Sequence, residues 1–167
     1  MKNANTSHSQ HPDILLADLE NPVHAQAVLG LVEAFALEPM SGGKKLSRSI
    51  RDAMIPGLRA QPTGRIFLAQ LSDRYVGTAI CFLGFSTFYA KPVINIHDLI
   101  VLEGYRGKGI GRRLLAAVSD HAHLSGCCKV TLEAREDNAG ALRLYQSAGF
   151  QSGDGKTARL LFLHKAL

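Results

Sequence analysis

A glycine-rich turn between an apolar segment and an amphipathic segment is the feature that most constrains what this chain can fold into. Residues 94–102 are mostly apolar and predict a buried strand. Residues 110–124 carry apolar side chains at helical spacing, and Gly126 ends the predicted helix. The turn between the two segments contains Gly107, Gly109 and Gly111. The sequence therefore predicts a strand that leads through a tight turn straight into a helix.

The composition of this turn is typical of an anion-binding loop. Glycines lack the Cβ atoms that keep a ligand away from the backbone, and the N–H groups in the first turn of a helix have no partners inside the helix. The helix dipole and the neighbouring basic side chains favour a phosphate group at such a terminus. The basic side chains are Arg106, Lys108, Arg112 and Arg113.

Two common phosphate-binding loops do not match the residues of the turn. A P-loop requires Lys and then Ser or Thr after its last glycine, whereas Ile110 and Gly111 follow Gly109. A dinucleotide-binding fingerprint requires Gly-x-Gly-x-x-Gly, whereas the spacing here is Gly-x-Gly-x-Gly and no second nucleotide-binding half follows. Neither of these loops is therefore expected, and a plain solvated turn between strand and helix stays an alternative.

The segment Arg106-Gly107-Lys108-Gly109-Ile110-Gly111 resembles the Arg/Gln-x-x-Gly-x-Gly/Ala signature of the GNAT superfamily of acyl-CoA N-acyltransferases. A later segment resembles the Asn-x-x-Ala-x-x-Leu-Tyr-x-x-x-Gly-Phe pattern of the same superfamily. It is carried by Asn138, Ala141, Leu144, Tyr145 and Gly149-Phe150. The two motifs stand in the right order and at the right separation, and the resemblance covers residues 67–163.

Hydrophobic periodicity and turn residues predict an α+β sandwich with a mixed sheet. Strands are expected at residues 14–19, 65–71, 74–86, 94–102 and 129–134, with closing strands near Phe150 and at 158–164. Helices are expected at residues 22–36, 46–55, 110–124 and 138–148, and Pro56-Gly57 is expected to end or kink the second. The resemblance implies a GNAT fold, a mostly antiparallel sheet with helices on both faces. In that fold the parallel strands at 94–102 and 129–134 splay apart.

Length and composition set the expected organisation and location. Residues 1–12 are polar and are expected to form a flexible arm, and residues 13–167 a single acetyltransferase domain. The arm lacks the apolar core of a secretory signal, and no apolar run is long enough to span a bilayer. We therefore expect a cytoplasmic protein with no membrane partner.

Charge and cysteine content limit the expected partners. The formal net charge of +5 indicates an anionic partner, and the basic residues cluster only around residues 106–113. Without a nucleic-acid-binding motif, an anionic cofactor explains this cluster better than nucleic acid does. Cys81, Cys127 and Cys128 form neither a disulfide framework nor a zinc-binding spacing, so no metal is expected.

The resemblance implies an acetyl-CoA site on the central strand and the glycine turn. Backbone groups of Leu99, Ile100 and Val101 would bind the pantetheine arm and the thioester carbonyl. An N–H aimed at that oxygen would stabilise the tetrahedral oxyanion by about 3–4 kcal/mol per donor. The turn would hold the pyrophosphate. The remaining expected cofactor contacts are Arg106, Gly107, Lys108, Gly109, Ile110, Gly111, Arg112, Asn138 and Tyr145.

The reaction implied by the resemblance is direct attack of a neutral primary amine on the acetyl thioester, which needs an acid and a base. Tyr145 holds the family position of the general acid and shares a helix face with Asn138, although it could instead pack its helix on the sheet. His97 is the expected base because histidine can take up a proton at physiological pH. The alternative is a structural His97, with water carrying the proton. In a regular strand the side chains of His97 and Asp98 point to opposite faces of the sheet. The two can line one pocket only if a β-bulge intervenes.

The amine acceptor stays open between small molecules and peptides. Residues 85–99 look like those of the polyamine-acetylating branch, whose members carry Glu-Asp where this chain has His97-Asp98, and the lost glutamate removes a charge that attracts a polycation. Phe85, Phe88 and Tyr89 are candidate lining residues, and Glu33, Glu38 and residues 39–45 fall at the family's acceptor-side wall by position. A non-catalytic acyl-CoA-binding or regulatory module is the alternative function. The resemblance also allows a homodimer.

Overall fold

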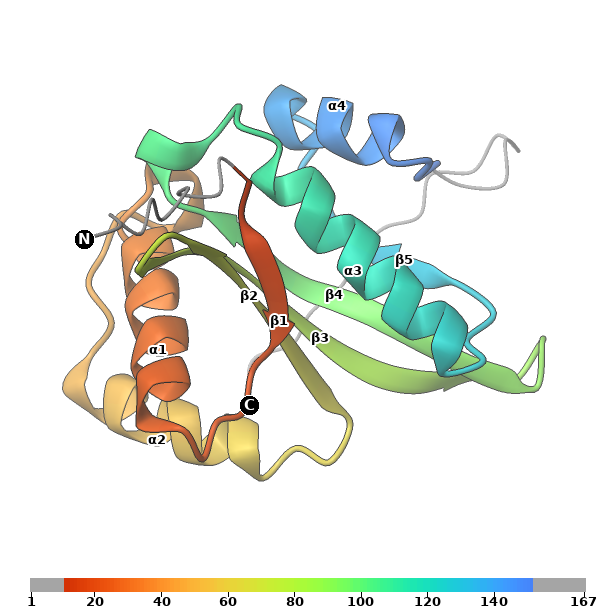
Figure 1. Cartoon of the computed structure of the whole chain (residues 1–167), viewed down its shortest axis with the longest axis horizontal. Coiled ribbons are helices and arrows are strands. Elements are labelled where there is room, and N and C mark those ends of the chain that lie inside the picture. The colour runs from red at the N-terminus through yellow and green to blue at the C-terminus, as the bar shows by residue number, and fades with distance from the viewer. Residues whose placement is uncertain (1–10, 152–167) are drawn as a thin grey trace, which may run out of the picture. The chain divides into compact units, whose positions relative to one another are not determined.

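The computed structural model describes residues 11–151 (Figure 1). The chain falls into two compact units. The described part of the first unit, Met1–Glu133, contains a sheet and three α-helices; that of the second, Ala134–Leu167, contains one α-helix. The strands are β1 (Asp13–Leu16), β2 (Gly64–Leu71), β3 (Arg74–Ser86), β4 (Lys91–Val101) and β5 (Val130–Leu132). The helices are α1 (Pro22–Ala36), α2 (Arg48–Arg59), α3 (Ile110–Leu124) and α4 (Ala139–Ser147). Short 3-10 turns lie at Pro39–Ser41 and Glu103–Tyr105.

The five strands of the first unit form one mixed sheet in the order β1-β2-β3-β4-β5. Each of the first four strands pairs antiparallel with its neighbour, whereas β4 and β5 run parallel. This arrangement confirms the predicted α+β class and the mostly antiparallel sheet. Of the predicted closing strands, residues 158–164 lie outside the described residues, and Phe150 is not part of a strand.

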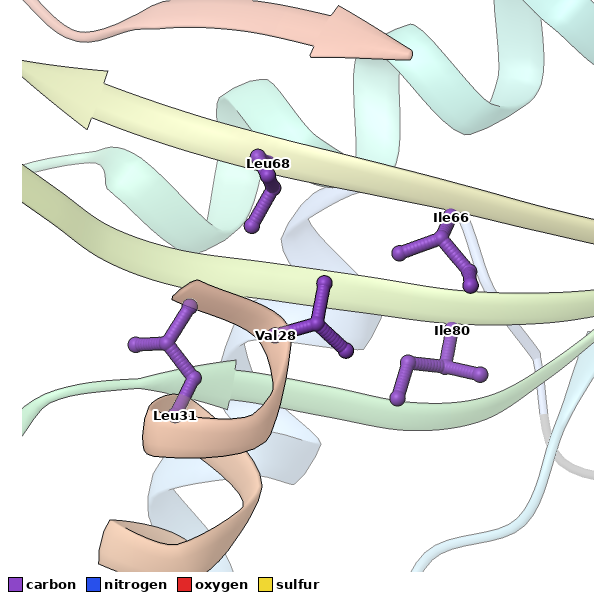
Figure 2. Close-up of a cluster of buried hydrophobic side chains, with 5 residues drawn as sticks. All are labelled: Val28, Leu31, Ile66, Leu68 and Ile80. Atoms are coloured by element: carbon purple, nitrogen blue, oxygen red, sulfur yellow. The ribbon is translucent and has the colours of Figure 1, made fainter. Parts of the chain in front are cut away.

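Helices cover both faces of the sheet. Val28 and Leu31 of α1 form a buried cluster with three sheet residues (Figure 2), namely Ile66, Leu68 and Ile80. Side chains alternate along a strand, and Phe67 therefore points to the other face. There its ring meets the ring of His121 on α3 edge-on, with centroids 5.6 Å apart. The sheet of the first unit is thus sandwiched between α1 and α3.

Local signals fixed most helix ends in this unit. The Asn21 side chain accepts a hydrogen bond from the Val23 N–H (2.9 Å), and Pro22 opens α1 as predicted. The second helix differs from the prediction, because α2 begins at Arg48 and continues through Pro56 to Arg59. Ile55 and Leu58 pack against the core on either side of the proline. The free energy gained from this packing exceeds the cost of the backbone hydrogen bond that proline cannot make.

The first strand, β1, begins at Asp13. Pro12, immediately before β1, is buried, and β1 ends at Leu16, earlier than predicted. Residues 1–10 lie outside the described part of the chain, so the expected flexible arm stays a prediction. Among the described residues, no helix combines the length and apolar character needed to cross a bilayer.

Candidate active site

The parallel strands β4 and β5 pair only over a short stretch. Their register joins Ile94 to Val130, Asn95 to Thr131 and Ile96 to Leu132, whereas β4 continues to Val101. The Asn95 amide donates a hydrogen bond to the Thr131 hydroxyl (3.1 Å), which ties the strands together just before they part. Beyond Ile96 the described part of the chain leaves this edge of β4 without a strand partner.

The unpaired stretch of β4 contains the backbone predicted to bind pantetheine. Leu99, Ile100 and Val101 pair on their other edge with β3. The Val101 carbonyl accepts a hydrogen bond from Arg106 Nε (3.0 Å), so one of the expected backbone groups already has a partner. The end of the pairing between β4 and β5 at Ile96 agrees with the predicted separation of the two parallel strands.

A β-bulge at His97 interrupts β4 where it leaves β5. Ile80 pairs with Asp98 and Cys81 pairs with Ile96, so His97 is an extra residue in the ladder. Ile80 packs against α1, and its cross-strand partner Asp98 therefore faces the same side. The regular alternation that would separate His97 from Asp98 is broken by the bulge.

The bulge brings the two polar side chains together. His97 Nδ1 lies 3.3 Å from Asp98 Oδ2, and the imidazole meets the Phe82 ring edge-on with centroids 5.9 Å apart. The His97 side chain is 68% exposed and that of Asp98 31% exposed. A carboxylate that holds one imidazole nitrogen leaves the other nitrogen available to a ligand.

The glycine turn has the backbone expected of an anion site. Gly107 and Gly109 adopt left-handed conformations with φ of 74° and 77°, which residues with side chains rarely take. Gly109 is the N-cap of α3, and no side chain caps this terminus. The first N–H groups of α3 therefore have no acceptor within the helix. Ile110 is buried and anchors the first turn on the core.

The basic side chains near the turn have partners within the protein. Arg106 pairs with the Glu38 carboxylate besides its hydrogen bond to Val101. The Lys108 ammonium lies 5.2 Å from the centroid of the Tyr105 ring, a cation–π contact. Arg112 belongs to the first turn of α3. That these three side chains contact a pyrophosphate stays a prediction.

The second unit carries the other two predicted site residues. Asn138 Oδ1 accepts a hydrogen bond from the Ala141 N–H (3.1 Å), so Asn138 caps α4. The Tyr145 ring is tilted against the ring of Phe150, with centroids 6.0 Å apart. Burial raises the pKa of Tyr145, which keeps its hydroxyl protonated to higher pH.

Two interactions near the site had no clear signal in the sequence. Glu38 was placed by position only, and its pairing with Arg106 joins residues far apart in the chain. Asn95 stands out as a polar residue within an apolar strand, but its partner Thr131 could not be inferred.

Phe85, Phe88 and Tyr89, predicted as lining residues, are 65%, 98% and 63% exposed. The structure does not bury them in a pocket.

The described residues hold no group of three or more His, Cys, Asp or Glu side chains that could bind a metal ion. All three cysteines are free thiols. Cys81 is buried, and its pKa is raised to about 12 by burial and then by the nearby Asp98 carboxylate.

Comparison with known proteins identifies the family. The model of the acetyltransferase (GNAT) family matches residues 31–150, and the chain belongs to that family. A solved structure described as a probable acetyltransferase shares the fold with a TM-score of 0.77 at 23% identity, covering 92% of this chain and 99% of that chain.

Curated relatives resemble parts of the chain. The N-alpha-acetyltransferase RimI of Mycobacterium tuberculosis is 41% identical over 91 residues, which cover 50% of this chain and 56% of RimI. The spermine/spermidine N(1)-acetyltransferase of Bacillus subtilis is 46% identical over 50 residues, which cover 29% of this chain and 33% of that enzyme. The chain spans about half the length of the first curated relatives it matches, with shares of 43%, 60% and 56%.

Proposed function

We propose that this protein is an N-acetyltransferase that moves the acetyl group of acetyl-CoA to a primary amine. The observation that carries the proposal is the free edge of β4, which begins where β5 leaves at Ile96 and runs to Val101. The strand leads directly to the glycine turn and the uncapped N-terminus of α3. An extended backbone edge next to an anion site suits a ligand that joins an amide-bearing arm to a pyrophosphate.

The turn suits a pyrophosphate because its binding groups belong to the backbone. The N–H groups around Gly109 and Gly111 would donate to the phosphate oxygens, and the dipole of α3 would favour their charge. Lys108 and Arg112 would add positive potential, whereas the charge of Arg106 is paired with Glu38. Along β4, backbone groups from Leu99 to Val101 would pair with the pantetheine amides and polarise the thioester carbonyl.

The chemistry requires one proton to leave the amine and one to reach the departing sulfur. We assign His97 as the base: its free ring nitrogen takes the proton while Asp98 orients the ring. The amine nitrogen forms a bond to the carbonyl carbon, and the tetrahedral intermediate then loses the C–S bond. We assign Tyr145 as the acid that protonates the thiolate. Its raised pKa supports this role, because the hydroxyl stays protonated at neutral pH.

The acceptor that we favour is an amine with no more than one positive charge, such as a small monoamine or a peptide N-terminus. Two acids that fall at the acceptor side by position are each paired with an arginine, Glu33 with Arg51 and Glu38 with Arg106. Such pairs leave little negative charge for a polyamine. The name of RimI, an N-alpha-acetyltransferase, agrees with this choice.

A thiol-release assay tests the function. Acetyl-CoA is incubated with the protein and a panel of monoamines, peptides with free N-termini, polyamines and aminoglycosides, and the free thiol of CoA is measured. We expect a monoamine or peptide to raise thiol release, and Tyr145→Phe to slow it by at least about 100-fold, as for loss of a general acid. Tyr75→Phe is the matched control, because its ring packs against His24 in the first unit.

The same panel separates an enzyme from a non-catalytic module. If acetyl-CoA binds in calorimetry but no amine raises thiol release, the protein is an acyl-CoA-binding module. If Tyr145→Phe keeps full activity, Tyr145 is a packing residue rather than the acid. Preferential acetylation of polyamines would overturn our assignment of the acceptor.

A further inference from the structure

We propose that Arg106 couples the glycine turn to the loop of residues 38–45, so that a ligand bound at the turn also orders this loop. Glu38, which receives the Arg106 guanidinium, is then a positioning residue. The inference rests on the proposed function in one respect: the turn must bind the pyrophosphate of CoA. It differs from the family-based expectation for Arg106, because here the side chain contacts the protein and not the phosphate.

The guanidinium of Arg106 joins three parts of the first unit. Its own backbone leads into the glycine turn, its Nε donates to the Val101 carbonyl at the end of β4, and its Nη2 pairs with Glu38 just beyond the end of α1. The Arg106 side chain is 48% exposed and that of Glu38 27% exposed. Partial shielding strengthens a charged hydrogen bond, and the planar guanidinium can serve two acceptors at once.

The loop of residues 38–45 is built around Glu38. The backbone carbonyl of Glu38 accepts hydrogen bonds from the N–H groups of Ser41 (2.9 Å) and Gly43 (3.0 Å). Gly42 and Gly43 both have left-handed backbones, which close this tight turn. Arg106 pairs with the Glu38 carboxylate, and the Glu38 carbonyl accepts two hydrogen bonds within the loop, so Glu38 links Arg106 to the loop.

The helices on either side of the loop are joined independently. Glu33 of α1 forms an ion pair with Arg51 of α2, which joins the two helices without involving the glycine turn. The Lys44 N–H donates to the Ala36 carbonyl at 3.1 Å and returns the chain to the end of α1. Glu33 therefore provides a matched control for Glu38, since both are acids on or just after α1 that pair with an arginine.

The coupling follows from these contacts. An anion held by the N–H groups of the turn restricts the backbone of Arg106, and its guanidinium then holds Glu38 in one place. The loop opens less often, and its amide hydrogens exchange more slowly. Since residues 38–45 were placed at the acceptor side of the site, CoA binding would shape the surface that meets the amine.

Hydrogen exchange measured by mass spectrometry, with and without saturating CoA, tests the coupling. In the unmodified protein we expect CoA to slow exchange in residues 38–45 by about fivefold, the lower end of usual coupling strengths. In Glu38→Gln we expect CoA to bind, by calorimetry, with no slowing in this loop. In Glu33→Gln we expect the loop to exchange faster without CoA but still to respond to it.

The outcomes are distinguishable. If CoA does not bind the unmodified protein, the proposed function fails. If CoA binds and the amide hydrogens of the loop exchange faster or at the same rate, Arg106 does not couple the glycine turn to the loop of residues 38–45. Faster exchange would mean that the phosphates draw Arg106 away from Glu38. Persistence of the protection in Glu38→Gln would equally overturn the inference. Should that variant not fold, Arg106→Lys replaces it, because an ammonium cannot serve Val101 and Glu38 with the same fork geometry.

Discussion

At Gly77 on β3, the backbone of β4 and two side chains of α3 leave no room for a larger side chain. A Cβ atom built there would lie 2.8 Å from the Ile100 carbonyl oxygen, 3.3 Å from Leu114 Cδ1 and 3.4 Å from Ile110 Cγ2. Leu114 and Ile110 are buried side chains of α3, and the Ile100 oxygen belongs to the backbone of β4. None of these atoms can rotate away freely. An alanine at this position must therefore displace β4 or α3.

We expect Gly77→Ala to destabilise the protein. Overpacking of a tight core costs about 1–3 kcal/mol. For a chain of this length each kcal/mol lowers Tm by about 2–4 °C, so the expected loss in Tm is about 2–12 °C. Gly84→Ala is the matched control on the same strand, because its Cβ would lie 3.6 Å from Val93 Cγ1, an ordinary contact. It should leave stability unchanged or slightly raised.

Urea unfolding measures both variants. A lower midpoint with an unchanged slope for Gly77→Ala, against a wild-type midpoint for Gly84→Ala, would agree with overpacking. Because Ile100 lies in the stretch of β4 proposed to bind pantetheine, we also expect weaker CoA binding by Gly77→Ala. Equal midpoints for the two variants would refute the argument, since they would show that β4 and α3 yield without cost.

Three further predictions concern single groups. Cys81 should resist iodoacetamide at pH 8 in the native protein, because burial raises its pKa to about 12. The partly exposed Cys127 and Cys128 should react, Cys127 more slowly because burial raises its pKa too. Mass spectrometry of the labelled peptides checks this, and rapid labelling of Cys81 would contradict it. Burial raises the pKa of Tyr145 in the folded protein, so on raising the pH the unfolded chain loses the tyrosine proton first. The contribution of Tyr145 to the free energy of unfolding is therefore complete below pH 10 and is lost as the pH rises through the pKa of the folded protein. Urea midpoints measured across this range, compared with those of Tyr145→Phe, report that loss. Asn138→Ala should destabilise α4 by about 1 kcal/mol through loss of the cap to the Ala141 N–H, seen as faster amide exchange in α4, whereas Asn138→Asp should keep the cap.

Much of the fold could be predicted because its signals are local. The bounds of β3 and α3 match the prediction, since the turn at Ser72-Asp73 and the glycines around α3 mark their ends within a few residues. The second helix was predicted too short, because a proline normally ends a helix and only the packing of Ile55 and Leu58 carries it onward. Local sequence does not contain that packing energy.

The sequence by itself indicated the family and the glycine turn proposed to bind an anion, and it supplied the residues proposed for acetyl transfer. These signals are local, because glycine spacing and short motifs act through backbone conformations that neighbouring residues set. The tertiary structure alone decided which groups meet. The bulge that places His97 beside Asp98 appears only in the register between β3 and β4. The pairing of Glu38 with Arg106 joins two segments that are far apart in the sequence, with strands β2, β3 and β4 between them. Such contacts depend on how strands align and helices pack, and that alignment is set by the burial of the whole core rather than by any short stretch of sequence.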